Sequence, residues 1–185
     1  MDWSCFPVLS TDRLLLRDIA LSDAKEIYMI YSDPKVSEFD SFSPYRTIGE
    51  ARDMISSFRK EFQEGKQIRW GIATKADNRL VGTCEFMSFD DASRRCEIGC
   101  GLMSSQWSKG YMREALEAII AYGFSVLDLN RIKACILSGN GASVRLFRKL
   151  GFTFEGVLRE KEYFKGQFHN EIMMSMLLGD YKLRF

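Results

Sequence analysis

The sequence predicts a mixed α/β (α+β) domain with a mostly antiparallel sheet and helices on both of its faces. Its 185 residues suit a single domain, which we expect to occupy residues 1–185. Its composition, 46% hydrophobic and 28% charged residues, is that of an ordinary globular protein. Short apolar runs separated by turn residues alternate with segments of helical period, which indicates a sheet combined with helices.

The first third of the chain predicts one strand and two helices. An apolar run at residues 13–17 predicts the first strand. Asp23 supplies an acid at the start of a helix that should end before Pro34, because proline disfavours the helical conformation in the residue before it. Thr47, three residues before a glutamate, opens a second helix with a capping-box pattern. Residues 36–46, between the two helices, show no clear period and are expected to form a loop.

The rest of the chain alternates between the two periods. Three strand-like runs are separated by Asp-, Asn- and Ser-rich turns, which indicates an antiparallel meander. A long helical segment that is apolar on most of its faces follows, and we expect it to be buried against the sheet. The chain should end with a hairpin that turns at residues 164–167. The expected elements are strands 68–74, 80–89 and 94–103, helix 110–127, strand 131–137, helix 141–150, and strands 152–158 and 171–178.

Charge and cysteine content argue against several classes of function. The 26 Lys and Arg residues nearly balance the 25 Asp and Glu residues, so bulk electrostatics gives no case for nucleic-acid binding. Five cysteines without a C-x-x-C pair, together with one histidine, argue against a metal site. The first residues lack the pattern of a signal peptide, and the longest apolar stretch, 118–127, is too short to span a bilayer. We expect a cytoplasmic protein with no metal, nucleic-acid or membrane partner.

The junction between strand 94–103 and helix 110–127 is a candidate anion site. Backbone N–H groups at the start of a helix are unpaired and lie at the positive end of its dipole, an arrangement that suits a diphosphate. Gly110 would let the backbone approach such a ligand closely. Taken alone, these residues are equally compatible with a plain tight connection.

Five short motifs occur in a fixed order along the chain. They are Thr11-Asp-Arg-Leu-Leu-Leu-Arg17, Glu97-Ile-Gly99, Trp107-Ser-Lys-Gly-Tyr-Met-Arg-Glu-Ala115, Asn140-x-x-Ser143 and Leu150-Gly-Phe152. In this order they resemble the GNAT superfamily of acyl-CoA-dependent N-acetyltransferases. They are most similar to its RimJ/RimL-like subgroup of ribosomal-protein N-acetyltransferases. The likeness covers about residues 10–179.

The resemblance implies a GNAT-like sheet of six to seven strands in which the central strands 94–103 and 131–138 splay apart. It also implies acetyl-CoA as a cosubstrate and a primary amine that attacks the thioester directly, without an acyl-enzyme. In that family the pantetheine arm lies between the splayed strands and the diphosphate lies on the loop before the helix. Carried onto this chain, the cofactor-binding residues are Leu102, Met103, Trp107, Ser108, Lys109, Gly110, Tyr111, Met112, Asn140 and Arg148.

Several positions bear on this assignment. Ser108 and Met112 stand where the family has small residues, and both side chains could crowd the diphosphate. Phe147 stands where many members carry a tyrosine that protonates the leaving thiolate, and phenylalanine has no proton to donate. Arg148 lies on a basic helix face that would meet the 3′-phosphate of CoA or remain solvated.

The resemblance also suggests catalytic residues. For the general base we consider Glu97 first, because it lies on the splayed strand, and Glu85 on the neighbouring strand second. An ion pair of Glu97 with Arg94 or Arg95 is an equally good interpretation. Ser143 is the remaining candidate for a hydrogen bond to the leaving sulfur, although it also suits the first turn of a helix.

The acceptor is expected beside the loop 36–46. Glu38 and Asp40 in that loop would attract a cationic amine, and its aromatic residues would pack against apolar parts of the acceptor. The subgroup favours a protein N-terminal α-amine, whose pKa of about 8 requires only a weak base. A polyamine or an aminoglycoside is the alternative acceptor, and a non-catalytic acyl-CoA-binding module is the alternative to an enzyme. A homodimer is a further family-level expectation.

Overall fold

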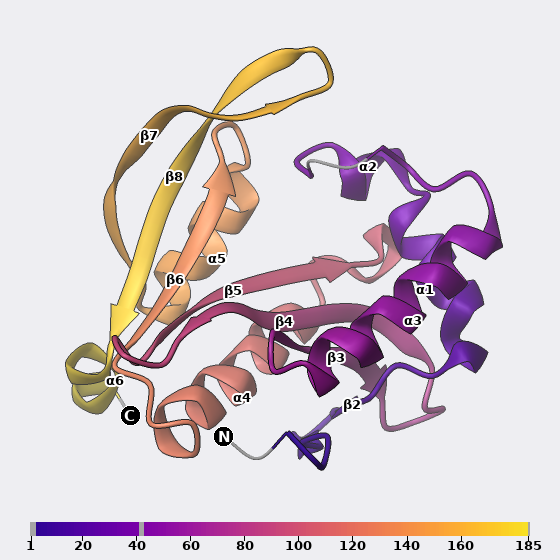
Figure 1. Ribbon diagram of the computed structural model, residues 1–185, viewed down its shortest axis with the longest axis horizontal. Coiled ribbons are helices and arrows are strands. Elements are labelled where there is room, and N and C mark those ends of the chain that lie inside the picture. The colour runs from indigo at the N-terminus through magenta and orange to yellow at the C-terminus, as the bar shows by residue number, and fades with distance from the viewer. Residues whose placement is uncertain (1–2, 41–42, 185) are drawn as a thin grey trace.

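The computed structural model describes residues 3–40 and 43–184 (Figure 1). They form one mixed sheet of eight strands in the order β1-β2-β3-β4-β5-β6-β8-β7, with helices on both faces, so the expected fold class is confirmed. The strand beyond the expected seven is the two-residue β1, which pairs with β2. The strands are β1 (Leu9–Ser10), β2 (Leu14–Arg17), β3 (Gln67–Thr74), β4 (Leu80–Asp90), β5 (Arg95–Leu102), β6 (Arg131–Leu137), β7 (Thr153–Phe164) and β8 (Gln167–Leu177).

Two buried clusters hold the helices against the sheet. On one face, α1 and α3 pack through side chains such as Ile27 and Ile55. On the other face, α4 and α5 pack against a cluster that contains Trp70 and Phe86. No helix in the described part of the chain combines the length and the apolar character needed to cross a bilayer. The helices are α1 (Ala24–Tyr31), α2 (Pro34–Ser37), α3 (Ile48–Gln63), α4 (Tyr111–Ser125), α5 (Gly141–Leu150) and α6 (Leu178–Arg184), with short 3-10 turns η1 (Leu21–Asp23) and η2 (Ser104–Gln106).

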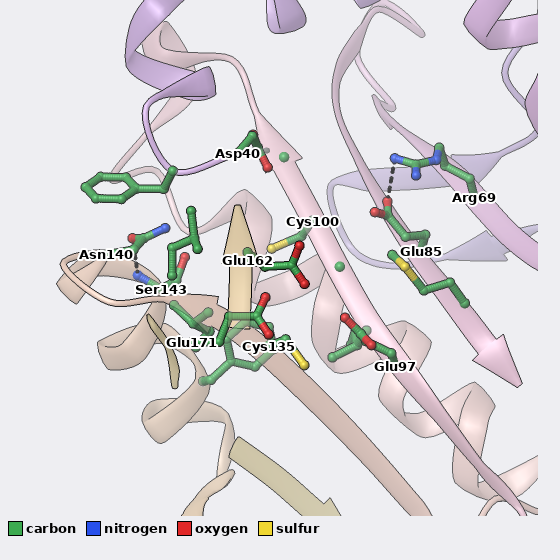
Figure 2. A pocket seen from close by; sticks show the side chains of 18 of the residues that line it. Asp40, Arg69, Glu85, Glu97, Cys100, Cys135, Asn140, Ser143, Glu162 and Glu171 are labelled. Carbon is green, nitrogen blue, oxygen red and sulfur yellow. Dashed lines mark hydrogen bonds and ion pairs between the residues drawn. The ribbon is translucent and has the colours of Figure 1, made fainter. Parts of the chain in front are cut away.

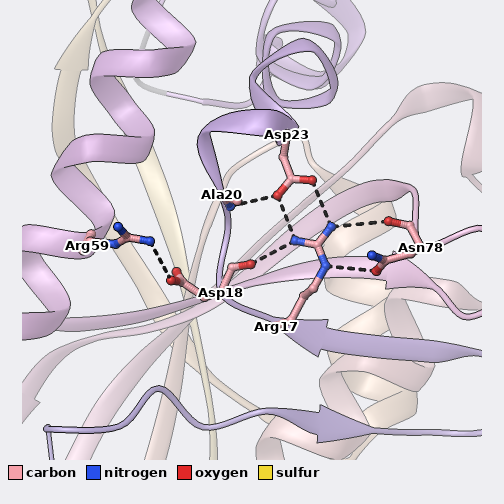
Figure 3. Close-up of polar contacts among 6 residues, drawn as sticks. All are labelled: Arg17, Asp18, Ala20, Asp23, Arg59 and Asn78. Atoms are coloured by element: carbon pink, nitrogen blue, oxygen red, sulfur yellow. Dashed lines mark hydrogen bonds and ion pairs between the residues drawn. The ribbon is translucent and has the colours of Figure 1, made fainter.

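The start of α1 is tied to the sheet by an acid. Asp23 accepts hydrogen bonds from both terminal nitrogens of Arg17, at 2.8 and 2.9 Å, and from the backbone N–H of Ala20 at 2.8 Å (Figure 3). The Arg17 guanidinium also donates to the side chain of Asn78 at 3.1 Å. This bidentate pair fixes the connection between β2 and α1, so the predicted N-terminal acid has a wider role than completing a helix turn.

The segment expected as a loop at 36–46 is partly helical. Helix α2 covers its first two residues, because the Asp33 side chain accepts a hydrogen bond from the N–H of Lys35 and Pro34 suits the first helical position. Residues 41–42 of this segment lie outside the described residues. Helix α3 begins as predicted, since Thr47 and Glu50 cap each other reciprocally.

The central strands β5 and β6 separate as expected. These parallel strands pair only at Arg95 with Arg131, Cys96 with Ile132, and Glu97 with Lys133. The pairing of β5 with β4 continues to the end of β5. Beyond these three pairs, β5 therefore has a hydrogen-bonded neighbour on one side only, and Figure 1 shows β5 and β6 diverging from a common end.

The last hairpin is longer than its sequence pattern suggests. Strand β6 makes its last pair with β8 at Glu171, whereas β7 and β8 continue to a turn at Lys165 and Gly166. The Lys165 ammonium donates to the carbonyl of Ser37 at 2.7 Å and so ties the tip of the hairpin to the end of α2. In Figure 1 the hairpin tip projects beyond β6 toward α2. The tip and the α2 segment thus meet on the side where β5 and β6 are apart.

Candidate active site

A cavity of about 430 Å³ opens where β5 and β6 separate. Its walls come from both strands, from β4, from α5, from the β7–β8 hairpin and from the segment after α2 (Figure 2). Its volume lies in the range of small-molecule binding sites. Of the predicted catalytic and cofactor-binding residues, Glu97, Asn140 and Ser143 line this cavity, and so does the second candidate base, Glu85.

Glu85 of β4 is a buried carboxylate, with 6% of its surface exposed. Its Oε2 lies 2.8 Å from Nη1 of Arg69 on β3, in an ion pair without hydrogen-bond geometry, and accepts no hydrogen bond from the described residues. Nη1 of Arg69 donates instead to the Tyr31 hydroxyl at 3.2 Å. Burial raises the pKa of Glu85, and the guanidinium of Arg69 offsets this only in part. A buried carboxylate with a raised pKa beside a cavity has the properties of a general base.

Gly99 explains how the Glu85 carboxylate fits against β5. The two residues are direct cross-strand partners. A Cβ atom at position 99 would lie 2.5 Å from Oε1 of Glu85 and 3.0 Å from Cε of Met87. Any larger residue would push the carboxylate away, so the Glu-x-Gly motif noted in the sequence keeps space for an acid on the neighbouring strand.

Glu97 lies where β5 and β6 cease to pair. Its Oε2 is 2.9 Å from Nζ of Lys133 on β6. The sequence suggested Arg94 or Arg95 as its partner, but both arginines pair with other carboxylates. The charge of Glu97 on β5 is therefore paired with that of Lys133 on β6, at the end of the gap where the two strands still form a pair.

The start of α5 supplies another wall of the cavity. Asn140 caps the helix as predicted, its Oδ1 accepting from the N–H of Ser143 at 3.1 Å. Ser143 lines the cavity one turn before Phe147, which is 3% exposed. The cap uses the backbone of Ser143, so its hydroxyl is not needed for capping.

The backbone of β5 offers hydrogen-bonding groups to the gap. The N–H of Met103 donates to the carbonyl of Val81 at 2.9 Å, so Met103 faces β4. Bonding direction alternates along an antiparallel pair, and we infer that Leu102 and Cys100 turn their N–H groups toward the gap. The carbonyl of Leu102 already accepts from Nε1 of Trp107 at 2.9 Å. The Met103 N–H is thus occupied by Val81, and of these two residues it is Leu102 whose N–H we infer to face the gap.

The loop between β5 and α4 has left-handed backbone at two positions. Ser108 has φ +64° and Gly110, the N-cap of α4, has φ +82°. A glycine is usual in the family at the first of these positions, and its left-handed φ gives the physical reason. The sequence suggested that the Met112 side chain could crowd the diphosphate. Instead, Met112 is 9% exposed and its side chain packs into the core, away from the loop. Lys109 and Tyr111 flank Gly110, with Lys109 exposed and Tyr111 half-buried.

Comparison with known proteins decides the family. The family described as "Acetyltransferase (GNAT) domain" matches residues 13–153. The chain belongs to the GNAT acetyltransferase family. It is 38% identical to an uncharacterized N-acetyltransferase of Bacillus licheniformis over 94% of this chain and 97% of that protein. It is 24% identical to the spermidine N(1)-acetyltransferase of Escherichia coli K12 over 93% of this chain and 90% of that protein. The ribosomal α-N-protein acetyltransferase RimL, solved with coenzyme A, has a similar fold, with TM-score 0.82, 22% identity, and coverage of 92% of this chain and 98% of that chain.

This GNAT enzyme is therefore an acetyl-CoA-dependent N-acetyltransferase. Its residues fit that cosubstrate, because the edge of β5 that no longer pairs with β6 leads into a loop at the N-terminus of the 15-residue helix α4. Arg148, for which the sequence left contact with the 3′-phosphate of CoA and a solvated position open, is exposed on α5 and makes no ion pair with the described residues. Among those residues, no group of three or more His, Cys, Asp or Glu is placed to hold a metal ion.

The cavity of this acetyltransferase is strongly acidic. Asp40 was anticipated from the sequence, whereas Glu162 and Glu171 of the hairpin were not. Asp40 and Glu171 form no ion pair with the described residues, while Glu162 lies 2.7 Å from Lys161. Burial and the nearby charge of Glu85 raise the pKa of Asp40 to about 6. Burial and the neighbouring Glu162 raise the pKa of Glu171.

Two cysteines also border the cavity, Cys100 on β5 and Cys135 on β6 (Figure 2). Burial raises the pKa of each thiol to about 12, so both remain protonated at neutral pH. Only a thiolate is an effective nucleophile. The site is accordingly suited to direct attack by the amine rather than to an acyl-cysteine.

Proposed function

We propose that this N-acetyltransferase acetylates a small amine with more than one positive charge, such as a polyamine, in the cavity between β5 and β6. The observation that supports this is the acidic lining. Among the residues that the structure describes, five carboxylates border the cavity and Arg69 is the single cationic lining residue. Two of these carboxylates, Asp40 and Glu171, form no ion pair with the described residues, although the charges of nearby lysines and of Arg69 lower their pKa values in part. Both carboxylates are half-buried, and a partly desolvated carboxylate that makes no ion pair is unfavourable, so ammonium groups of a substrate would stabilise it.

A protein N-terminal α-amine is the second candidate acceptor, because the motifs resemble those of the ribosomal-protein subgroup and the fold is similar to that of RimL. An N-terminus brings one ammonium, whereas a polyamine brings one for each of several carboxylates. The similarity to a spermidine N(1)-acetyltransferase supports the same preference. The cavity volume of about 430 Å³ suits a small molecule.

For the reaction, we propose that Glu85 removes a proton from the acceptor ammonium, directly or through a water. Glu85 lines the cavity, and its Oε2 accepts no hydrogen bond from the described residues. The N–H of Leu102 or Cys100 would stabilise the oxyanion that develops as the amine attacks the thioester carbonyl. Ser143 would donate a hydrogen bond to the departing sulfur. Glu97, the first candidate from sequence, remains the alternative base.

An acceptor screen monitored by thiol release tests the substrate. We expect turnover with polyamines to exceed turnover with mono-amines and with peptides that carry a free N-terminus. Asp40→Asn and Glu171→Gln should each raise KM for a polyamine about 10-fold, because each loses a charged contact, and should change KM for a mono-amine less. In the wild type, KM for a polyamine should fall as pH rises through about 6, where Asp40 becomes charged, and Asp40→Asn should lose this dependence.

Glu160→Gln is the matched control for this test, since Glu160 is an exposed acid of the same hairpin that does not line the cavity. Its KM values should equal those of the wild type. Turnover of N-terminal peptides in preference to polyamines would contradict the polyamine proposal and support the protein acceptor. Binding of acetyl-CoA without thiol release in any mixture would support a binding module instead.

Ser143→Ala separates a role in the chemistry from helix capping. The cap is a backbone bond to Asn140, which alanine preserves, so we expect α5 and the affinity for CoA to be unchanged. Loss of one hydrogen bond to the leaving sulfur should lower kcat about 10-fold. Ser143→Thr, which keeps a hydroxyl, should restore most of the rate. A wild-type kcat in the alanine variant would exclude the assigned role.

A further inference from the structure

The opening motif Thr11-Asp-Arg13 has a structural partner on α4. Oε1 of Glu114 accepts from Oγ1 of Thr11 at 2.6 Å and from the backbone N–H of Arg13 at 2.9 Å. Oε2 of Glu114 accepts from Nε of Arg13 at 2.7 Å. Partial burial of Glu114 would by itself raise its pKa, but these hydrogen bonds hold the pKa below its usual range. Glu114 is therefore a fixed anion that orients the Arg13 side chain.

Arg13 continues from Glu114 to the loop that precedes α4. Its Nη1 donates to the carbonyl of Lys109 at 3.1 Å, and its guanidinium lies 4.7 Å from the centre of the Tyr111 ring. Its Nη2 is 3.3 Å from the place that a Cβ atom on Gly110 would occupy. One guanidinium therefore contacts the residues on both sides of Gly110, Lys109 and Tyr111, at the point where left-handed backbone enters the helix.

This contact determines which way the loop amides point. The peptide between Lys109 and Gly110 is trans, since the described residues contain no cis peptide bond. In a trans peptide the C=O and the N–H point in opposite directions. A Lys109 carbonyl held by Arg13 therefore directs the Gly110 N–H to the opposite side of the loop. The left-handed conformation of Ser108 is unfavourable for a residue with a side chain, so the loop benefits from an external support.

We propose that Arg13, oriented by Glu114, is a positioning residue for acetyl-CoA. Through the Lys109 carbonyl it turns the N–H of Gly110 toward the diphosphate. This inference rests on the assignment of the loop as the diphosphate site. Arg13 acts through the Lys109 carbonyl, on the side of the peptide that faces away from the Gly110 N–H. Its own charge is paired with Glu114 at 2.7 Å, so geometry rather than charge carries the effect.

The test compares two thioesters on purified variants. Arg13→Ala should raise the Kd for CoA and the KM for acetyl-CoA about 10-fold, which corresponds to one charge-assisted hydrogen bond. It should leave the KM for the amine unchanged, and it should leave kcat/KM unchanged for S-acetylpantetheine, which lacks the diphosphate. Arg13→Lys keeps the charge but cannot reach Glu114 and Lys109 together, so it should resemble Arg13→Ala.

Arg113→Ala is the control, because it removes another arginine at the start of α4, in an exposed pair with Glu117. Its affinity for CoA should match the wild type. An Arg13→Lys variant with wild-type affinity would overturn the positioning role in favour of charge, and equal losses with both thioesters would overturn it in favour of general destabilisation. If the wild type itself did not prefer acetyl-CoA to S-acetylpantetheine, the assignment of the loop would fail instead.

Discussion

Glu85→Gln should lower kcat by about 100- to 10,000-fold, the range for loss of a general base. Glutamine has nearly the same shape and still fits against Gly99, so the cavity should keep its form. The affinity for CoA should not change, because Glu85 does not lie on the loop before α4. The acidic limb of the kcat–pH profile should disappear, since the wild-type enzyme needs Glu85 deprotonated and burial raises its pKa.

Glu97→Gln is the companion variant. Glu97 lines the same cavity, but its charge is matched by Lys133 at 2.9 Å. We expect a fall in kcat of less than about 10-fold from this variant, the size of an altered hydrogen bond near the site. Steady-state kinetics on both proteins decide between the two acids. A large fall in kcat for Glu97→Gln with a small fall for Glu85→Gln would show that Glu97, not Glu85, is the general base.

Arg69→Met should lower the free energy of unfolding by about 3–5 kcal/mol at pH 8, because it leaves Glu85 buried without its cation. Both partners are buried, with side chains 12% and 9% exposed, so solvent cannot compensate. Methionine can still pack on the Phe58 ring, over which the guanidinium lies at 4.4 Å. Denaturant unfolding measures the loss.

The pH dependence of this loss has a definite sign. Without Arg69 the pKa of Glu85 rises further above its unfolded value. A carboxyl whose pKa is raised by folding contributes stability at low pH and loses that contribution as pH rises toward the folded pKa. The destabilisation should therefore be smaller at pH 5 than at pH 8. The double variant Arg69→Met/Glu85→Gln should recover most of the stability at pH 8, and a double variant as unstable as the single one would show that the charge of Glu85 is not the cause.

Sequence pattern predicted the elements whose side chains alternate or follow a helical period. The helix 141–150 has the predicted bounds, and the hairpin turn lies within 164–167 as expected. Strand β7 extends to Phe164, beyond the expected 152–158. The sequence pattern missed this extension because most of the added residues are charged and exposed, and pairing with β8 rather than burial keeps them extended. Helix α6 was missed because none of its residues is buried, so it shows no apolar period.

The site was predictable where a motif lies on one element and not where distant elements meet. Asn140 and Ser143 follow from a local pattern that the helix cap explains. Glu162 and Glu171 come from a hairpin more than 60 residues away from Glu97, and no local pattern links them to it. Arg69 is a single charge in an apolar strand, and only the fold shows that it lies beside the second candidate base.

Only three residue pairs between β5 and β6 join the two parts of the sheet. One part, β1 to β5, carries Glu85 and the edge of β5 that no longer pairs with β6. The other, β6, β8 and β7, carries Glu171 and Glu162. A slight rotation of one part about these three residue pairs would change the distance between Glu85 and the two acids of the hairpin, while the strand pairing within each part stays intact. The hydrogen bond from Lys165 at the hairpin tip to Ser37 joins the second part to the end of α2, across the open end of the cavity, and would limit such a rotation.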